Sequence, residues 1–185
     1  MNVTLHPWSD QDLPVLHRGN TPEMTAHLGG TESEEEVRHR HERYLRLSHT
    51  GEARMFRIDV DGRPAGGIGW WQTDHDGTPA YEAGWNVFPE WQGRGVAGAA
   101  LREVTRRVAA EGDRGLLVAY PGVDNVASNR LCRRAGFERI RTGTTPWRGG
   151  ELRFNAWALD ISALDLAGRT PDREERFDGD TLYPG

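Results

Sequence analysis

A glycine-rich stretch, Gln92-Gly93-Arg94-Gly95-Val96-Ala97-Gly98, follows a strand-like segment by a few residues and opens an amphipathic helix. The first amides of a helix have no partner within the helix, and the helix dipole makes that end positive. Glycines let the backbone approach an anion because no Cβ stands in the way. The stretch therefore predicts a loop that binds a phosphate.

Gly93, Gly95 and Gly98 also fit the G-x-G-x-x-G pattern of dinucleotide-binding folds. That pattern normally follows a strand of a parallel sheet directly, whereas residues 89–92 intervene here and the preceding strands look antiparallel. The next predicted strand ends in Tyr120-Pro121, without the acidic residue that binds a ribose. A dinucleotide-dependent oxidoreductase and a glycine turn without a ligand are the less favoured alternatives.

The segments around this loop predict a sheet flanked by helices. Apolar patterns predict strands at 3–8, 54–60, 65–71, 81–88, 116–120, 137–142 and 152–159. Helical spacing predicts helices at 10–19, 33–50, 95–111 and 125–135, the second beginning with a capping box of Ser33 and Glu36. Because helix 95–111 crosses over between strands 81–88 and 116–120, we expect these two strands to be parallel.

This order of elements is that of an α+β fold with one mixed, mostly antiparallel sheet. We expect residues 1–160 to form a single domain. Asp, Arg, Gly and Pro dominate residues 161–185, which predicts a loosely held polar tail.

The composition excludes several classes of function. The net charge of −5 gives no electrostatic case for binding nucleic acid. All 23 Lys and Arg positions are arginine, so no lysine can form a Schiff base. No apolar run resembles a signal peptide or is long enough to span a bilayer, so no membrane partner is expected. The single cysteine, Cys132, cannot form an internal disulfide, which favours a cytoplasmic location.

Two motifs resemble those of the GNAT superfamily of acyl-CoA-dependent N-acyltransferases. Residues 92–97 match its Q/R-x-x-G-x-G/A signature, and residues 125–137 resemble its N-x-x-S/A…G-F helix. Segments 20–30 and 81–85 are similar to the branch that includes the ribosomal-protein N-terminal acetyltransferases. The resemblance runs from about residue 3 to residue 160 and implies an acetyltransferase domain.

The resemblance implies that acetyl-CoA lies where strands 81–88 and 116–120 splay apart. Backbone groups of Asn86, Val87 and Phe88 would hold the pantetheine arm, and the amides of Gly93 to Gly98 would hold the pyrophosphate. Asn125 would contact the coenzyme arm, with a helix N-cap as its structural alternative.

The implied transfer of acetyl to an amine needs a base, because the amine must lose a proton before it attacks. Glu82 lies ten positions before Gln92, which matches the spacing of a glutamate in this branch, and a solvated strand carboxylate is its alternative. The amide of Val87 or Phe88 is expected to stabilise the oxyanion.

The proton donor to the leaving thiolate is open. Many GNAT enzymes carry a tyrosine at the position that is Cys132 here. Cys132 is therefore one candidate, with core packing as its alternative. Ser128 and Tyr120 are the substitutes. The missing tyrosine also motivates a second hypothesis, a non-catalytic acyl-CoA-binding or sensor protein.

The acceptor is open between a protein N-terminus and a small amine. Trp147, on the expected loop 142–150, and one of Trp70 and Trp71 are candidates for bordering the acceptor groove. The arginine-rich segment 38–46 is interpreted as a solvated helix face. No metal site is expected, and a homodimer stays open.

Overall fold

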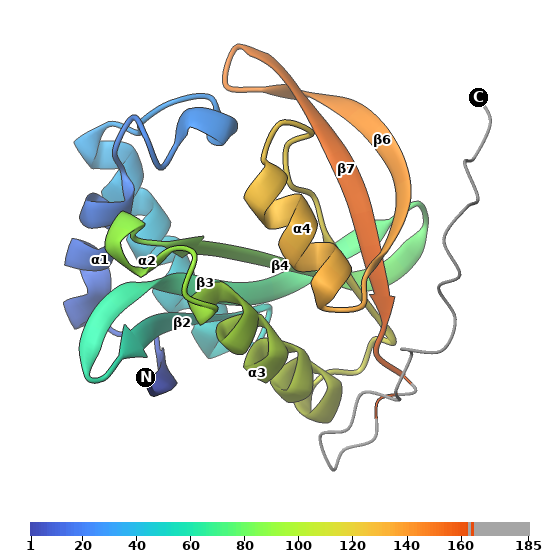
Figure 1. Ribbon diagram of the computed structural model, residues 1–185, viewed down its shortest axis with the longest axis horizontal. Coiled ribbons are helices and arrows are strands. Elements are labelled where there is room, and N and C mark those ends of the chain that lie inside the picture. Colours follow the sequence, from blue (N-terminus) through green and yellow to red (C-terminus); the bar gives the residue numbers. More distant parts are fainter. Residues whose placement is uncertain (163, 165–185) are drawn as a thin grey trace.

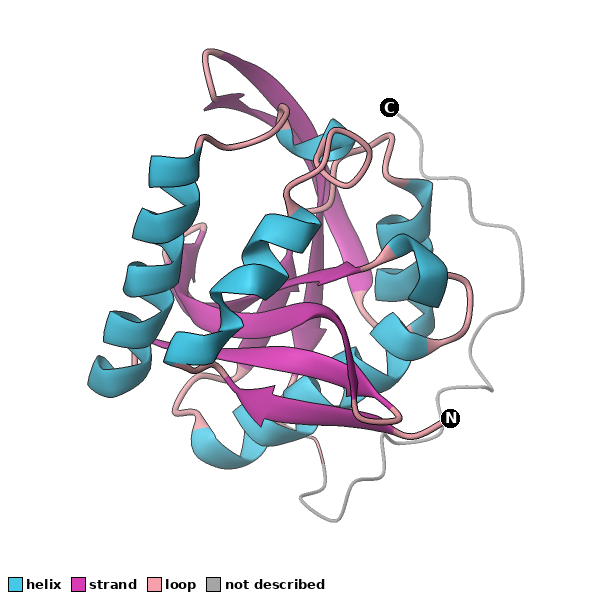
Figure 2. Cartoon of the chain, turned by 90° about the vertical axis from the view of Figure 1, so that its left-hand side faces the viewer, coloured by secondary structure: helices cyan, strands magenta, loops and turns pink. Residues whose placement is uncertain are grey.

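The computed structural model describes residues 1–162 and 164, which build one seven-stranded sheet with helices on both faces (Figures 1 and 2). The strands are β1 (Val3–Pro7), β2 (Ala53–Val60), β3 (Arg63–His75), β4 (Thr78–Val87), β5 (Leu116–Ala119), β6 (Glu138–Trp147) and β7 (Gly150–Asp160). Their order in the sheet is β1-β2-β3-β4-β5-β7-β6. β4 and β5 run parallel, and every other neighbouring pair is antiparallel. The predicted α+β class and the parallel pair are confirmed.

The helix that was predicted from capping residues, α2 (Glu34–Thr50), begins and ends where those residues lie. The helices are η1 (Asp10–Asp12), α1 (Leu13–Gly19), η2 (Ala26–Leu28), α2 (Glu34–Thr50), η3 (Pro89–Trp91), α3 (Val96–Glu111) and α4 (Val126–Arg134). The capping box of α2 forms as expected: the Glu36 amide donates to Ser33 Oγ at 3.3 Å, and the Ser33 amide donates to the Glu36 carboxylate at 2.7 Å. Gly51 ends α2 in the left-handed conformation.

The sheet separates two apolar cores, because successive side chains of a strand point to opposite faces. On the face covered by α3, the main core is fully buried at Ile58, Ile68, Leu101, Val104 and Leu117. On the other face, α1 and α2 pack on a second core of Trp8, Val15, Leu16, Val37, Met55 and Phe88. Trp70 belongs to the first core and Trp71 packs on the second.

β3 and β6 run furthest beyond the ends that the sequence pattern predicts, and β4 and β7 begin two or three residues earlier than predicted. β3 extends to His75, where it pairs with Thr78. β6 extends to Trp147 and turns at Arg148-Gly149, both with positive φ, so the expected loop 142–150 is wrong. Both extensions carry polar or exposed side chains, which weaken the apolar pattern. They are strands because their backbone groups pair with the neighbouring strand.

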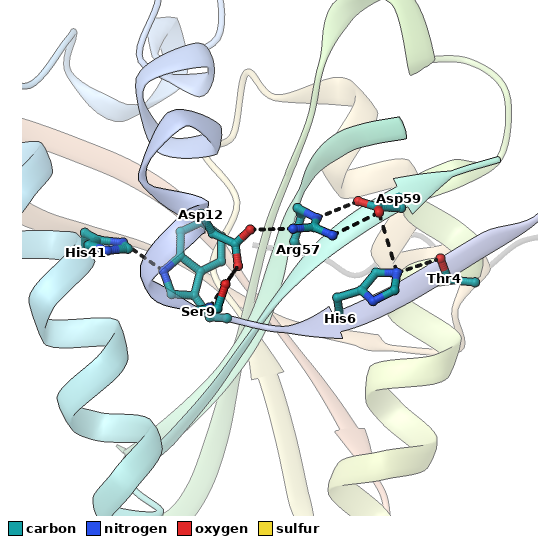
Figure 3. Close-up of polar contacts among 8 residues, drawn as sticks. Thr4, His6, Ser9, Asp12, His41, Arg57 and Asp59 are labelled. Carbon is teal, nitrogen blue, oxygen red and sulfur yellow. Dashed lines mark hydrogen bonds and ion pairs between the residues drawn. The ribbon is translucent and has the colours of Figure 1, made fainter. Parts of the chain in front are cut away.

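A chain of charged groups fastens the N-terminal segment to the sheet (Figure 3). Asp12 is 1% exposed and accepts a hydrogen bond from Arg57 at 2.7 Å. Arg57 also pairs with Asp59 at 2.7 Å, and Asp59 lies 3.5 Å from His6 of β1. These contacts fix η1, and the α1 helix that follows it, against β2.

No helix among the described residues is long and apolar enough to cross a membrane. The predicted polar tail, 161–185, lies outside the described residues except at 161, 162 and 164.

Candidate active site

The parallel strands β4 and β5 separate soon after they meet. They pair at two positions, Tyr81 with Leu117 and Glu82 with Val118. β4 continues to Val87 while held by β3 on its other edge, whereas β5 ends at Ala119. The edge of β4 over 83–87 therefore faces a gap, as the splayed pair predicts.

The backbone of β4 shows which groups enter that gap. The Phe88 amide donates to the Ala65 carbonyl on the β3 side at 2.8 Å. Groups of neighbouring residues point to opposite edges of a strand, so the Val87 amide points to the gap. The Val87 carbonyl points there too, and the Gln92 side chain donates to it at 2.8 Å. Of the two expected oxyanion donors, Phe88 is already engaged and Val87 is left.

Asn86 holds the end of β4 close to β3. Its Oδ1 accepts a hydrogen bond from the Gly67 amide at 2.7 Å. Gly66 has a φ of 153°, and a Cβ there would lie 2.1 Å from the Asn86 carbonyl oxygen. A side chain at position 66 would therefore push β4 away from β3 and disturb the edge that borders the gap.

The glycine-rich loop has the geometry of an anion site. Gly93 and Gly95 adopt φ of 70° and 81°, and a Cβ on either would meet no atom within 4 Å. The Ala99 amide makes the helical hydrogen bond to the Gly95 carbonyl, so the three preceding amides lie in the unpaired first turn of α3. Gly98 lies inside α3, where a Cβ would make ordinary contacts. The exposed Arg94 lies over the Trp91 ring.

The glycine-rich loop does not lie in the context of a dinucleotide-binding fold. A doubly wound sheet places its glycine loop within consecutive parallel strands. Here β2, β3 and β4 are antiparallel neighbours, and η3 separates β4 from the loop. The dinucleotide interpretation of the glycines is wrong for this reason.

A cavity of about 680 Å³ lies beside the gap, and Glu82 is one of its walls. Trp71, directly opposite on β3, forms another wall, and its ring occupies the space above Gly84, where a Cβ would lie 2.6 Å away. Burial raises the pKa of Glu82 to about 7, and a hydrogen bond from Trp71 offsets part of that rise. At neutral pH this carboxyl is thus poised between its two protonation states.

Tyr120 and His75 form a hydrogen-bonded pair in the lining of the same cavity. His75 Nδ1 lies 2.7 Å from the Tyr120 hydroxyl, and both residues line the cavity. Burial, together with the negative charge of Glu82, raises the pKa of Tyr120 to about 12. When Nδ1 carries the proton, it donates to the phenol oxygen and leaves the phenol O–H free to donate into the cavity.

The cavity brings together three of the four side chains expected to carry chemistry: Glu82, Tyr120 and Ser128. Cys132 is fully buried in the main core, outside the cavity lining, and burial raises the pKa of its thiol to about 12. Asn125 lines the cavity and also caps α4, with its Oδ1 accepting from the Ser128 amide at 3.0 Å. Both interpretations of Asn125 are therefore compatible with its position.

Sequence reasoning missed His75, Arg40 and Arg43 as cavity residues. His75 precedes the Asp76-Gly77 pair, and this pattern predicts a turn but carries no sign of a role for the histidine. Arg40 and Arg43 belong to the segment interpreted as a solvated face, but this side of α2 faces the cavity. One signal was available: the two arginines are three residues apart, so they share one side of the helix.

The tip of the β6–β7 hairpin closes the rim of the cavity. Trp147, 42% exposed, donates from Nε1 to the Leu28 carbonyl at 2.7 Å. Arg148 donates to the Gly30 carbonyl at 2.8 Å. The hairpin tip is thus bonded to the segment between α1 and α2. Within residues 1–162 and 164, no three His, Cys, Asp or Glu side chains gather to hold a metal ion.

The sequence profile described as "Acetyltransferase (GNAT) domain" matches residues 2–138. The chain belongs to the GNAT acetyltransferase family. It is an acyltransferase, and GNAT enzymes use acetyl-CoA as co-substrate. A search of curated protein sequences finds no match to this GNAT chain.

Solved structures share the GNAT fold of this chain at low sequence identity. RimL, a ribosomal L7/L12 alpha-N-protein acetyltransferase in complex with coenzyme A, is 22% identical, covers 88% of this chain and 96% of that chain, and has a TM-score of 0.75. The aminoglycoside acetyltransferase AAC(6')-Ib with coenzyme A is 18% identical, with 86% and 95% covered and a TM-score of 0.71. A spermidine N-acetyltransferase from Vibrio cholerae with CoA and spermine is 17% identical, with 86% and 96% covered and a TM-score of 0.71.

Proposed function

We propose that this GNAT protein transfers acetyl from acetyl-CoA to a primary amine by direct attack in a ternary complex. The observation that carries the proposal is Glu82, a half-buried carboxyl with a pKa of about 7 that lines the cavity beside the open edge of β4. A carboxylate with this pKa can accept a proton from an ammonium group at neutral pH.

The loop before α3 and the edge of β4 offer backbone groups suited to bind the coenzyme. The unpaired first-turn amides of α3 and the open glycines of 93–95 would hold the pyrophosphate. The edge of β4 over 83–87 would pair with the pantetheine amides as an added strand pairs with a sheet. This arrangement aims the thioester at the cavity that contains Glu82.

The chemistry then needs a base, a donor to the oxyanion and a donor to the leaving sulfur, and the chain offers the first two in Glu82 and the Val87 amide. Glu82 accepts a proton from the ammonium, directly or through water, and the freed amine nitrogen attacks the thioester carbon. The Val87 amide donates to the oxyanion of the tetrahedral intermediate. The C–S bond breaks as the intermediate collapses, and the nitrogen's second proton passes to the leaving thiolate, directly or through water, which gives the amide and free CoA thiol.

Tyr120 fits a hydrogen-bond donor to the leaving sulfur better than a full proton donor. Its pKa of about 12 lies above the ~8.5 of an ordinary thiol, so the thiolate does not take the proton outright. A hydrogen bond from the phenol still stabilises the charge that develops on sulfur.

Release of free thiol from acetyl-CoA with a panel of amines tests the proposal. We expect turnover with at least one primary amine, and a fall in kcat of about 10²- to 10⁴-fold in Glu82→Gln, which keeps the shape but removes the base. Glu138→Gln, on the exposed strand β6, is the matched control and should keep wild-type kcat.

The same experiment addresses the sensor hypothesis, in which coenzyme binds without chemistry. Calorimetry that shows acetyl-CoA binding without turnover of any amine, and with identical behaviour in Glu82→Gln, would favour a sensor. If acetyl-CoA does not bind and no amine is acetylated, both hypotheses are refuted.

The acceptor is proposed as a primary amine on a protein N-terminus or a small molecule. The relatives' names support this range: one acts on a ribosomal protein N-terminus, one on aminoglycosides and one on spermidine. A cytoplasmic location is part of the proposal, supported by the single free cysteine.

A further inference from the structure

The wall of the cavity formed by α2 is rich in arginine. Arg40 and Arg43 of α2 line the cavity, and Arg148 from the hairpin tip lines it nearby. One carboxylate, Glu32, is shared by two of them, at 2.5 Å from Arg40 and 3.0 Å from Arg148. Arg40 and Arg148 therefore share the carboxylate of Glu32, and Arg148 also lies near Glu36, in a protein whose net charge is −5.

The guanidinium groups of this wall are incompletely paired. No hydrogen bond or ion pair joins Arg43 to any other residue within 1–162 and 164. Arg40 is 22% exposed, and its Nε is buried without a hydrogen-bond partner. An unpaired buried donor is unfavourable, so this wall is suited to receive an acceptor atom from a ligand.

The cationic wall stands apart from the proposed base. The pKa of Glu82 has two causes, burial and the hydrogen bond from Trp71, and no arginine lowers it. No ion pair joins Glu82 to Arg40, Arg43 or Arg148, all of which lie within the described residues 1–162 and 164.

The part of the cavity lining away from α2 is acidic rather than basic. Asp74, Asp76 and Glu82 line it, and Arg141 pairs with Asp76 at 3.0 Å. An amine that enters with its cationic end toward Glu82 meets carboxylates there, while the rest of the molecule extends toward arginine.

We propose that the acceptor is a primary amine that also carries an anionic group, a carboxylate or a phosphate, several bonds from the nitrogen, and that Arg43 and Arg40 bind this anion. The inference rests on the proposed acetyl transfer and names its substrate class. Arginine offers several donors in one plane, which suits both anions. Polyamines place a second cation against this wall, so they are poor acceptors.

The test measures kcat/KM with paired acceptors at saturating acetyl-CoA. Ala-Glu-Ala amide is compared with Ala-Gln-Ala amide, and O-phosphoethanolamine with ethanolamine; spermine is the cationic probe. We expect the anionic member of at least one pair to be favoured about tenfold, the scale of one charge-assisted hydrogen bond. The pair that shows the preference tells whether the anion is a carboxylate or a phosphate.

Arg43→Gln should bring that ratio close to one, and Arg43→Lys should keep part of it. Arg46→Gln is the matched control, because Arg46 lies on the same helix but outside the cavity lining, and it should keep the wild-type ratio. Equal kcat/KM within both pairs, or a preference for spermine, would overturn the inference while leaving acetyl transfer intact.

Product binding keeps the test decisive if turnover is slow. In the CoA-loaded full chain, calorimetry compares the N-acetylated Glu peptide and N-acetylphosphoethanolamine with their neutral counterparts. We expect an anionic product to bind about tenfold more tightly. Equal affinities within both pairs, with CoA itself bound, would contradict the anion site alone.

Discussion

At Glu82, two neighbouring strands set the proton affinity of one carboxyl group. Burial in the cavity disfavours its charged form and raises the pKa to about 7. The Trp71 indole, directly across the β3–β4 pair, donates to the carboxylate and lowers the pKa. The balance of these two effects makes Glu82 the group whose titration should control activity.

The pH dependence of kcat/KM follows from this balance. Because the base works only when ionised, activity should rise with pH through about 7 and fall about tenfold for each pH unit below it. Trp71→Phe removes the stabilising donor, so the acidic limb should move to higher pH. A profile that is flat between pH 6 and 8 in the wild type would remove Glu82 from the role of base.

Substitutions of Tyr120 and Cys132 should have opposite effects: the first should lower activity and the second should lower stability. Tyr120 lines the cavity, so Tyr120→Phe should lower kcat about tenfold, which is about 1.4 kcal/mol of transition-state stabilisation. Cys132 is buried in the core, so Cys132→Ala should lower the free energy of unfolding by about 1 kcal/mol and leave kcat within about twofold. Steady-state rates and urea titrations measure both. The reverse pattern would make the thiol the donor.

At the scale of elements, the turn into α3 needs a left-handed backbone at Gly95, which glycine adopts without strain. Gly95 has a φ of 81°, and its Cβ space is open, so Gly95→Ala adds strain of about 1–2 kcal/mol without a clash. We expect the KM for acetyl-CoA to rise, because the strain is relieved by turning the first amides of α3 away from the pyrophosphate.

Gly62→Ala is the control for that substitution. Gly62 lies at the β2–β3 turn with a φ of 77° and equally open Cβ space. It should lose similar stability in thermal unfolding while the KM for acetyl-CoA stays at the wild-type value. Equal KM values in the two variants would argue against pyrophosphate binding by the loop.

At the scale of the whole molecule, Arg57 joins the N-terminal segment to the sheet. Arg57→Ala leaves the carboxylate of Asp12, which is 1% exposed, without its charged partner, while the Ser9 amide and hydroxyl still donate to its other oxygen. We expect the free energy of unfolding to fall by about 3 kcal/mol, as when one member of a buried pair is removed. Urea titration measures it. Arg63→Ala, an exposed arginine at the start of β3, should change it by less than about 0.5 kcal/mol.

Much of the fold was predictable because local rules decided it. The capping box at Ser33 and the Asp-Gly turns at 61–62 and 76–77 depend on a few adjacent residues and formed as expected. The crossover helix required β4 and β5 to be parallel. The extended ends of β3 and β6 were not predictable, because backbone pairing with a neighbouring strand, rather than an apolar pattern, makes them strands.

By itself, the sequence determined the order of helices and strands along the chain, the glycine loop at the start of α3 and the candidate base Glu82, since each depends on spacing along the chain. Only the tertiary structure decided which candidates meet. It buried Cys132 in the core and joined Tyr120 to His75 across 45 positions. It also turned Arg43 toward a cavity. Contacts of this kind depend on packing between distant segments, and no local pattern of residues carries them.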